Sequence, residues 1–315
     1  MPDLASEFEA ERDHLMAVAY RMLGSRAEAE DAVQDAWLRY AAALGEPDTR
    51  AEIRDARAWL ITATARICLD ALRSARVRRE AYVGPWLPEP LVARLPDPGA
   101  DDPGERAVRA DEVSMALLVV LERLTPEQRV AFVLHDVFAV PFDEVAGVLS
   151  STPAAARKLA SRARRAVAEG GPRHTADLPE QRRVMAAFVA AAESGDLDRL
   201  VAVLAPDVVA VGDGGGVAPG GRAAVRGDVR VARFMLGLFR RARKEASALL
   251  VEPVLVNGAL GLLVEVTAGD GERLRFVMAF AVDGGRVTGI FDQLNPDKLR
   301  GVPAADPAAV GVPRL

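Results

Sequence analysis

Cysteine and histidine are scarce in this chain of 315 residues. Cys68 is the only cysteine, which excludes an internal disulfide framework and a cysteine-based zinc site. The histidines, His14, His135 and His174, lie far apart along the sequence and offer little to a metal centre. We therefore expect no metal, no cofactor and a reducing compartment, the cytoplasm.

A long hydrophobic run is also missing. A membrane helix needs about 18 apolar residues, and the best candidate, residues 248–266, is interrupted by Glu252, Pro253 and Asn257. The first residues are acidic, where a secretory signal would be basic and then apolar. Half of the residues are nonetheless hydrophobic, so we expect buried cores, no contact with a membrane, and a length that allows about two domains.

Charge is distributed in blocks that the net charge of −5 conceals. The first 48 residues hold 4 basic and 11 acidic side chains, whereas residues 49–80 hold 8 arginines and 4 acids. Residues 157–165 hold 5 basic side chains and no acid. Either basic patch alone would be interpreted as a solvated helix face, but two of them at helical spacing favour a polyanionic partner.

The pattern of apolar residues divides the chain into a helical half and an α+β half. Helical spacing occurs over residues 15–23, 33–44, 56–79, 108–124, 184–189 and 197–204, and strands are expected at 208–211, 273–282 and 286–291. Thr125 and Gln128 form a capping-box pattern around Pro126. The expected segments are a helical domain at 1–80, a proline-rich linker at 81–106, a second helical domain at 107–170, a linker at 171–177, an α+β domain at 178–299 and a tail at 300–315.

Residues 142–167 have the layout of a helix-turn-helix. A short helix at 143–149 is followed by a serine turn, Thr152 as N-cap and Pro153 at the first helical position. Small residues face inward on the second helix, and its outward face carries donors suited to phosphates and base edges. An ordinary helical hairpin with a basic solvent face is the alternative. The outward donors are Arg157, Lys158, Ser161, Arg162 and Arg165.

A second stripe lies on the helix expected at 56–79. Trp59, Thr62, Arg66 and Arg73 recur at spacings of 3, 4 and 7 residues and so share one face. An aromatic ring beside arginines suits unstacked bases and single-strand phosphates. By itself, Trp59 fits a core position equally well.

Residues 29–39, Ala-Glu-Asp-Ala-Val-Gln-Asp-Ala-Trp-Leu-Arg, resemble the acidic region 2 helix of bacterial extracytoplasmic-function (ECF) sigma factors. Ala58-Trp59-Leu60 and the arginine-rich helix resemble the part of region 2 that melts and reads the −10 element. Residues 124–165 resemble region 4, whose helix-turn-helix reads the −35 element. The resemblance implies two all-α sigma domains and no catalytic residue.

Roles follow from this resemblance. Glu30, Asp31, Gln34 and Asp35 would dock on the β′ clamp helices of core RNA polymerase, and region 4 would meet the β flap. The Trp59 stripe would lie along the melted non-template strand of promoter DNA. His135 occupies a −35-contacting position that is often arginine in related factors, which puts that contact in doubt.

Residues 177–291 resemble the SnoaL-like domain, a cone of helices and a curved sheet of the nuclear-transport-factor type. One ECF subgroup carries this domain, which is thought to act as an internal regulator in place of a separate anti-sigma factor. Its loop signature is expected to face region 2 and its C-terminal signature to approach the linker, where Trp86 would be an apolar anchor. Val217 replaces the lysine that usually follows the loop signature. The three signatures are Trp86-Leu87-Pro88-Glu89-Pro90, Asp213-Gly214-Gly215-Gly216 and Asn295-Pro296-Asp297-Lys298-Leu299.

Two other functions are open on the sequence. SnoaL-like relatives include polyketide cyclases, yet no histidine, tyrosine or cysteine occurs from residue 175 onward, which leaves carboxylates such as Asp213, Glu265 and Asp292 for acid–base work. An apolar cavity lined by Phe276, Met278 and Phe280 would suit a filled core or a small hydrophobic ligand. A ligand-responsive repressor would explain the basic helix, but not the acidic helix or the linker signature. The sequence favours an ECF sigma factor with a fused regulatory domain.

Overall fold

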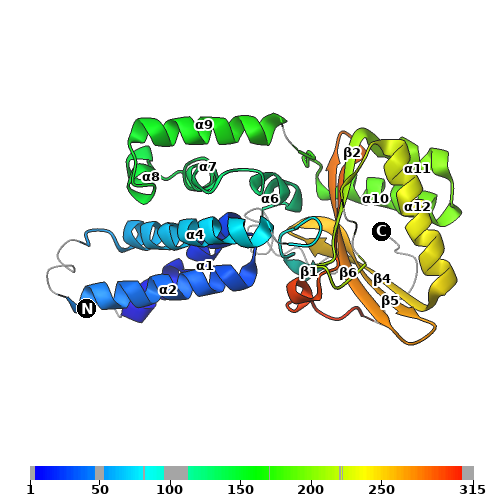
Figure 1. The fold of residues 1–315 in the computed structure, drawn as a ribbon, viewed down its shortest axis with the longest axis horizontal. Helices are drawn as coiled ribbons and strands as arrows, with labels where there is room; N and C mark the ends of the chain where they lie inside the picture. Colours follow the sequence, from blue (N-terminus) through cyan, green and yellow to red (C-terminus); the bar gives the residue numbers. More distant parts are fainter. Residues whose placement is uncertain are drawn as a thin grey trace. The chain divides into compact units, whose positions relative to one another are not determined.

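The computed structural model describes residues 4–46, 53–80, 82–95, 113–169, 171–219, 221 and 223–306. The chain divides into two compact units (Figure 1). The first combines residues 1–81 with 120–170, and the second combines residues 82–119 with 171–315. Each unit is thus assembled from two separate stretches of the chain.

The N-terminal part of the first unit is helical, as the sequence predicts. It contains α1 (Leu4–Leu23), α2 (Arg26–Gly45) and α4 (Ala56–Glu80), which pack on one another around an apolar core. Gly24 adopts a positive φ of 70° between the first two helices. Ser25 then caps α2, because its hydroxyl accepts a hydrogen bond from the Glu28 amide at 3.3 Å.

The remainder of the first unit contains the expected helix-turn-helix. After α6 (Met115–Leu121), which lies inside the range expected as helix at 108–124, come α7 (Pro126–Phe132), the π-helix η1 (Val133–Val137), α8 (Phe142–Val148) and α9 (Pro153–Glu169). Residues 108–112 of that expected helix lie outside the described part. The capping box at Thr125 and Gln128 is present, and Thr152 accepts from the Ala155 amide at 3.2 Å. Local cap chemistry therefore predicted these helix starts correctly.

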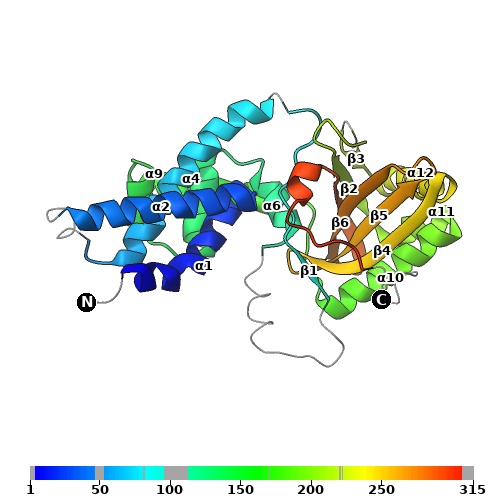
Figure 2. The same cartoon turned by 90° about the horizontal axis from the view of Figure 1, so that it is seen from below.

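The second unit is built on a seven-stranded sheet with the order β1-β4-β5-β6-β7-β2-β3 (Figures 1 and 2). Neighbouring strands are antiparallel except for β2 and β7, which are parallel. The strands are β1 (Val92–Arg94), β2 (Leu204–Asp213), β3 (Val225–Arg226), β4 (Ala246–Val256), β5 (Ala259–Ala268), β6 (Arg273–Asp283) and β7 (Arg286–Gln293). The helices are α10 (Leu178–Ser194), α11 (Leu197–Val203), α12 (Asp228–Glu245) and the 3₁₀-helix η2 (Pro296–Leu299).

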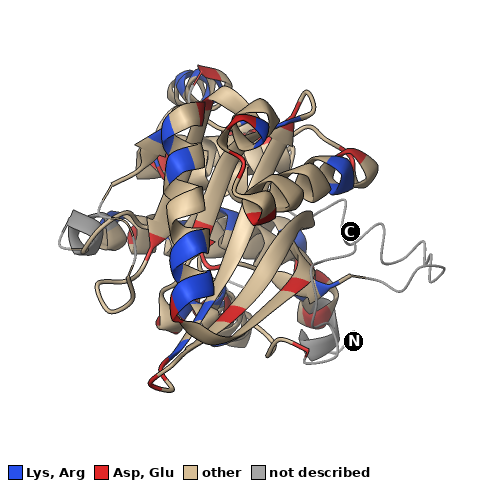
Figure 3. Ribbon diagram, turned by 90° about the vertical axis from the view of Figure 1, so that its right-hand side faces the viewer, with Lys and Arg blue, Asp and Glu red and all other residues tan. Residues whose placement is uncertain are grey.

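Several of these elements were not predicted. Residues 248–266, the best candidate for a hydrophobic run, form most of β4 and β5, and no described helix is long and apolar enough to cross a membrane. The expected extended linker supplies β1, in which Val92 pairs with Val256 of β4. Leu204, expected at a helix end, begins β2. Helix α12 was also missed, and Figure 3 shows basic residues recurring along it.

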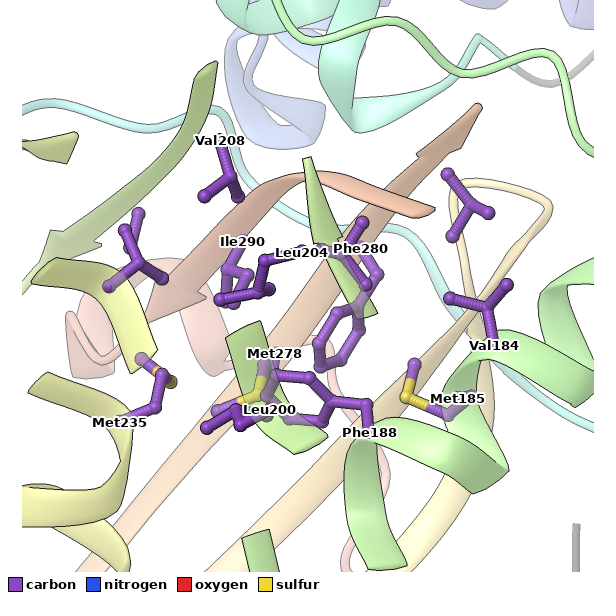
Figure 4. Close-up of a cluster of buried hydrophobic side chains, with 14 of the residues drawn as sticks. Val184, Met185, Phe188, Leu200, Leu204, Val208, Met235, Met278, Phe280 and Ile290 are labelled. Atoms are coloured by element: carbon purple, nitrogen blue, oxygen red, sulfur yellow. The ribbon is translucent and has the colours of Figure 1, made fainter. Parts of the chain in front are cut away.

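Both faces of the sheet are covered. On one face α10, α11 and α12 enclose an apolar cluster in which the rings of Phe188 and Phe280 lie 5.3 Å apart (Figure 4). On the opposite face a second cluster includes Leu87 of the linker, Phe291 of β7 and Leu299 of η2. The linker signature and the C-terminal signature are therefore parts of the folded domain, on the back of its sheet.

Candidate functional site

The acidic surface expected to meet polymerase is exposed on α2. Its inward face consists of Ala29, Ala32, Val33, Ala36 and Tyr40, so the intervening positions point to solvent. These outward residues are the predicted Glu30, Asp31, Gln34 and Asp35. Glu30 forms an ion pair with Arg26 one turn earlier, at 2.9 Å.

Leu38 extends this surface and was missed by the sequence analysis. It is 57% exposed and lies one helical turn after Gln34. A leucine on the polar side of an amphipathic helix breaks the helical pattern, and that break was the available signal. Leu38 gives the acidic surface an apolar contact point.

The predicted −10 stripe lies on α4. Trp59 and Thr62 are half-buried, and the Trp59 ring lies 5.4 Å from the Tyr40 ring, so this tryptophan is partly a packing residue. Arg66 and Arg73 are exposed, but both are hydrogen-bonded. Their partners, Gly147 and Glu127, come from the expected region 4.

The predicted −35 surface lies on α9. Ala156, Ala160 and Ala163 are fully buried, which turns the basic side of this helix outward. Arg164 is held by Asp136 of η1 at 2.7 Å. The predicted Arg157, Lys158, Ser161, Arg162 and Arg165 are all exposed, and the first four line an open depression of about 300 Å³.

His135 is oriented by its own neighbours. It lies half-buried in η1, its Nδ1 donates to the Val140 carbonyl at 2.9 Å, and its ring stacks on Phe142 at 3.6 Å between centroids. The guanidinium carbon of Arg157 lies 5.4 Å from the centre of the Phe142 ring. A −35 contact from His135 therefore stays a prediction, and any such contact would use Nε2.

The three subgroup signatures meet at Asp213, which is completely buried. Its Oδ1 accepts from the Tyr82 hydroxyl at 2.6 Å, and its Oδ2 accepts from the Leu87 amide at 2.8 Å and from Lys298 Nζ at 2.7 Å. Asn295 Nδ2 donates to the Tyr82 hydroxyl at 2.9 Å. We refer to Tyr82, Leu87, Asp213, Asn295 and Lys298 as the signature node.

Lys298 makes two further contacts with the linker. Its ammonium donates to the Leu87 carbonyl at 2.5 Å and lies 3.9 Å from the centre of the Trp86 ring. Trp86 is half-buried whereas Leu87 is fully buried, so Leu87 is the apolar anchor that was expected at Trp86. The C-terminal signature thus lies against the linker, and the loop signature bonds to the linker as well.

The glycines of the loop signature allow this close approach. Gly215 has a φ of +64°, and a Cβ there would lie 2.5 Å from Asn295 Cγ. Gly216 lies against Val83 of the linker. The Gly214 carbonyl accepts from the amides of Val217 and Ala218, which closes the turn.

The remaining signature residues complete this packing. Pro88 is buried, and its carbonyl accepts from Gln293 Nε2 at 3.1 Å. Pro296 begins η2, and Leu299 at its end is buried. Asp297 pairs with Arg300 on the surface. Tyr82 and Gln293 were missed by the sequence analysis, because neither belongs to a signature. Burial and the neighbouring Asp213 carboxylate raise the pKa of Tyr82 above its usual value, which keeps the phenol a hydrogen-bond donor.

The carboxylates weighed for catalysis do not converge. Asp213 belongs to the node on the back of the sheet, and Glu265 pairs with Arg275 at 3.3 Å. Asp292 follows Phe291 on β7 and so faces the helix side, where burial raises its pKa to about 7. Met278 and Phe280 are buried in the packed cluster of Figure 4, with Phe276 at its edge. In the described part of the chain, no three His, Cys, Asp or Glu side chains could hold a metal ion.

Three protein families match the chain in order: Sigma-70 region 2 over residues 8–78, Sigma-70 region 4 over residues 114–167, and the SnoaL-like domain over residues 185–290. The chain is 49% identical over 302 residues to the ECF RNA polymerase sigma factor SigJ of Mycobacterium tuberculosis, with 95% of this chain and 94% of SigJ covered. The chain belongs to the ECF sigma factors.

Further comparisons agree with this assignment. This sigma factor is 34% identical over 303 residues to a probable ECF sigma factor SigI of M. tuberculosis, with 94% of each chain covered. The crystal structure of M. tuberculosis SigJ superposes with a TM-score of 0.75 at 45% identity, covering 95% of this chain and 99% of that one. The predicted fold, two helical sigma domains and a SnoaL-like α+β domain, is confirmed. The family replaces both alternatives: its members direct transcription initiation and are not ligand-responsive repressors, and they are not enzymes, which removes the cyclase interpretation.

Proposed function

We propose that this sigma factor binds core RNA polymerase, directs it to promoters with −10 and −35 elements, and is modulated by its fused SnoaL-like domain in place of a separate anti-sigma factor. The observation that carries the proposal is the segregation of charge in the first unit. Its α2 presents Glu30, Asp31 and Asp35 to solvent, whereas residues 157–165 of α9 carry 5 basic side chains and no acid. One protein surface thus suits a basic protein partner and the other suits DNA.

Polymerase docking is assigned to α2. The acids, together with Gln34 and the exposed Leu38, suit a complementary helical surface such as the β′ clamp helices, and region 4 would contact the β flap. Charged rims increase the rate of association, and an apolar side chain at the centre supplies most of the binding energy. Leu38 is the candidate for that centre.

Promoter recognition is divided between two helices. In our proposal α9 enters the major groove at the −35 element, where its small inward residues hold it against α7 and α8. The α4 stripe of Trp59, Thr62, Arg66 and Arg73 holds the melted strand at the −10 element through stacking and phosphate contacts. Both functions belong in the bacterial cytoplasm.

The SnoaL-like domain would act through the linker. Only Ala81 separates the end of α4 at Glu80 from Tyr82 of the signature node. In our proposal the domain influences the helix assigned to the −10 element through this short connection. The packed cluster of Figure 4 favours a filled core over a small apolar ligand as the contents of the cone.

A pulldown of purified core RNA polymerase tests the proposal. Asp31→Arg/Asp35→Arg should abolish capture of core enzyme by the full chain. Glu9→Arg/Asp13→Arg is the matched control, because these acids are also exposed and four residues apart, but on α1. Equal loss in both variants would attribute the effect to net charge, and failure of the wild-type chain to capture core enzyme would refute the proposal.

A further inference from the structure

The two arginines of the −10 stripe are already occupied by region 4. Arg73 donates from Nε at 3.2 Å and from Nη2 at 3.0 Å to one carboxylate oxygen of Glu127, at the start of α7. Arg66 Nη2 donates to the Gly147 carbonyl of α8 at 3.0 Å. We refer to these contacts as the region 2–4 bridge. They use the same guanidinium donors that would otherwise hold phosphates.

A third arginine lies between the same regions. Arg129 of α7 is 2% exposed, pairs with Glu122, and donates from Nε to the Arg21 carbonyl of α1 at 3.3 Å. Its Nη2 has no hydrogen-bond partner among the described residues. Burial lowers the pKa of Arg129 to about 9, which means that the surroundings disfavour its charge. The contact between the regions is therefore close, but it contains a poorly solvated cation.

Size shows that this arrangement does not read a whole promoter. Elements at −10 and −35 are about 25 base pairs apart, which is about 85 Å along a duplex at 3.4 Å per base pair. A compact body of about 130 residues has a radius of gyration near 14 Å. Regions 2 and 4 must separate before each can reach its element.

We propose that the structure is a closed, DNA-free form in which the Glu127 carboxylate and the Gly147 carbonyl take the places of strand phosphates on Arg73 and Arg66. The inference rests on the proposed −10 role of α4. In this form region 4 competes with the single strand for the same donors, so strand binding requires the regions to part. The device is poised to open, since the Arg73–Glu127 pair is solvated and the Arg129 guanidinium gains water when α7 leaves.

Removal of the competing charge tests the closed form. Binding of fluorescein-labelled oligo(dT) to the full chain without polymerase is followed by fluorescence anisotropy, because stacking platforms tolerate any base. Glu127→Gln should tighten binding several-fold. Glu169→Gln, which removes an exposed acid at the end of α9, should change it by less than twofold. Equal affinities of the two variants would overturn the proposal.

Locking the regions together gives the opposite test. Arg66→Cys/Gly147→Cys joined by a short, disulfide-containing bismaleimide would hold α4 to α8, and a Cβ at Gly147 meets no atom within 4 Å. Cys68 would not compete, because burial raises its pKa to about 12. Because Arg66→Cys itself removes a donor, the reduced double variant is the reference, and the bridged protein should bind oligo(dT) more weakly than this reduced form. Equal binding by the bridged and reduced forms would refute the closed form.

These outcomes are separable from those of the proposed function. The chain could capture core polymerase through Asp31 and Asp35 while its oligo(dT) affinity is unchanged by Glu127→Gln and by the cross-link. That result would identify a sigma factor without this closed form. A chain that fails to capture core polymerase refutes the function itself.

Discussion

The signature node and the region 2–4 bridge fasten two parts of the chain by opposite means. At the node, Asp213 is fully buried and Lys298 is 14% exposed, and their 2.7 Å pair is supplemented by a phenol and a backbone amide. At the bridge, Arg73 and Glu127 are 51% and 36% exposed. Salt and water weaken an exposed pair far more than a buried one. The node suits a permanent attachment, and the bridge suits one that opens.

This difference fits a division of labour. The linker has to remain part of the SnoaL-like domain if that domain is to influence α4, whereas regions 2 and 4 have to part at a promoter. The node achieves permanence by satisfying each polar group that it buries. If burial and pairing, and not proximity alone, account for this contrast, variants at the two sites should differ in stability accordingly.

The largest effect on the free energy of unfolding is expected at Asp292, a buried carboxylate for which no described residue supplies the kind of cation that Lys298 provides for Asp213. Asp292 is buried, its Oδ1 has no partner among the described residues, and its pKa is raised to about 7. The unfolded chain loses this proton near pH 4 and the folded chain near pH 7, so the folded state binds more protons between those values. Stability therefore falls as pH rises from 4 to 7, by up to about 4 kcal/mol. Urea unfolding of the wild-type chain and Asp292→Asn should show this slope only in the wild type, and an unchanged slope would contradict the assignment.

Loss of the node's cation should be next in size. Lys298→Met leaves the Asp213 charge buried beside neutral donors, which should lower the free energy of unfolding by about 3 kcal/mol. Arg300→Met is the control, because Arg300 makes a surface ion pair with Asp297 in the same segment. Denaturant titrations of both variants measure the difference. Similar losses would show that the node is no firmer than a surface pair.

Backbone geometry at the node should contribute less. Gly215→Ala places a methyl group 2.5 Å from Asn295 Cγ at a φ of +64°, whereas Gly284→Ala has a φ of +56° and no atom within 4 Å. Left-handed strain alone costs about 1 kcal/mol, and the clash should bring the cost at Gly215 to about 2 kcal/mol. Thermal unfolding of both variants separates the two contributions. Equal shifts would mean that Asn295 moves freely.

Local signals in the sequence predicted much of the first unit. The capping box at Thr125 and the cap at Thr152 depend on residues three positions apart, so each is readable without the fold. The outward placement of Asp31 and Arg162 likewise follows from helical periodicity. The resemblance supplied the signature residues and the approach of the C-terminal signature to the linker. It placed the loop signature against region 2, so the bonds of Asp213 to Leu87 and Lys298 were not predicted.

Long-range contacts were not predictable in the same way. Strands β4 and β5 were missed because several of their residues are buried on both faces of the sheet, which removes the alternation that marks a strand. The Tyr82 hydroxyl donates to Asp213, which lies 131 positions later in the sequence, and no local pattern predicts this hydrogen bond. Arg73 looks the same in the sequence whether its guanidinium is free or bound to Glu127. Only the fold shows that the Arg73 guanidinium already donates to Glu127.

The smallest effect is expected at the region 2–4 bridge. A double-mutant cycle of Arg73→Ala and Glu127→Gln should give a coupling energy below about 1 kcal/mol, because both side chains are partly exposed. That coupling should vanish in molar salt, whereas a parallel cycle at Asp213 and Lys298 should retain most of its value. A bridge as strong and as salt-resistant as the node would end the contrast between them, since regions 2 and 4 would then need an energy source to separate. A weak, salt-sensitive bridge means instead that a modest gain from polymerase or DNA contacts is enough to open the closed form.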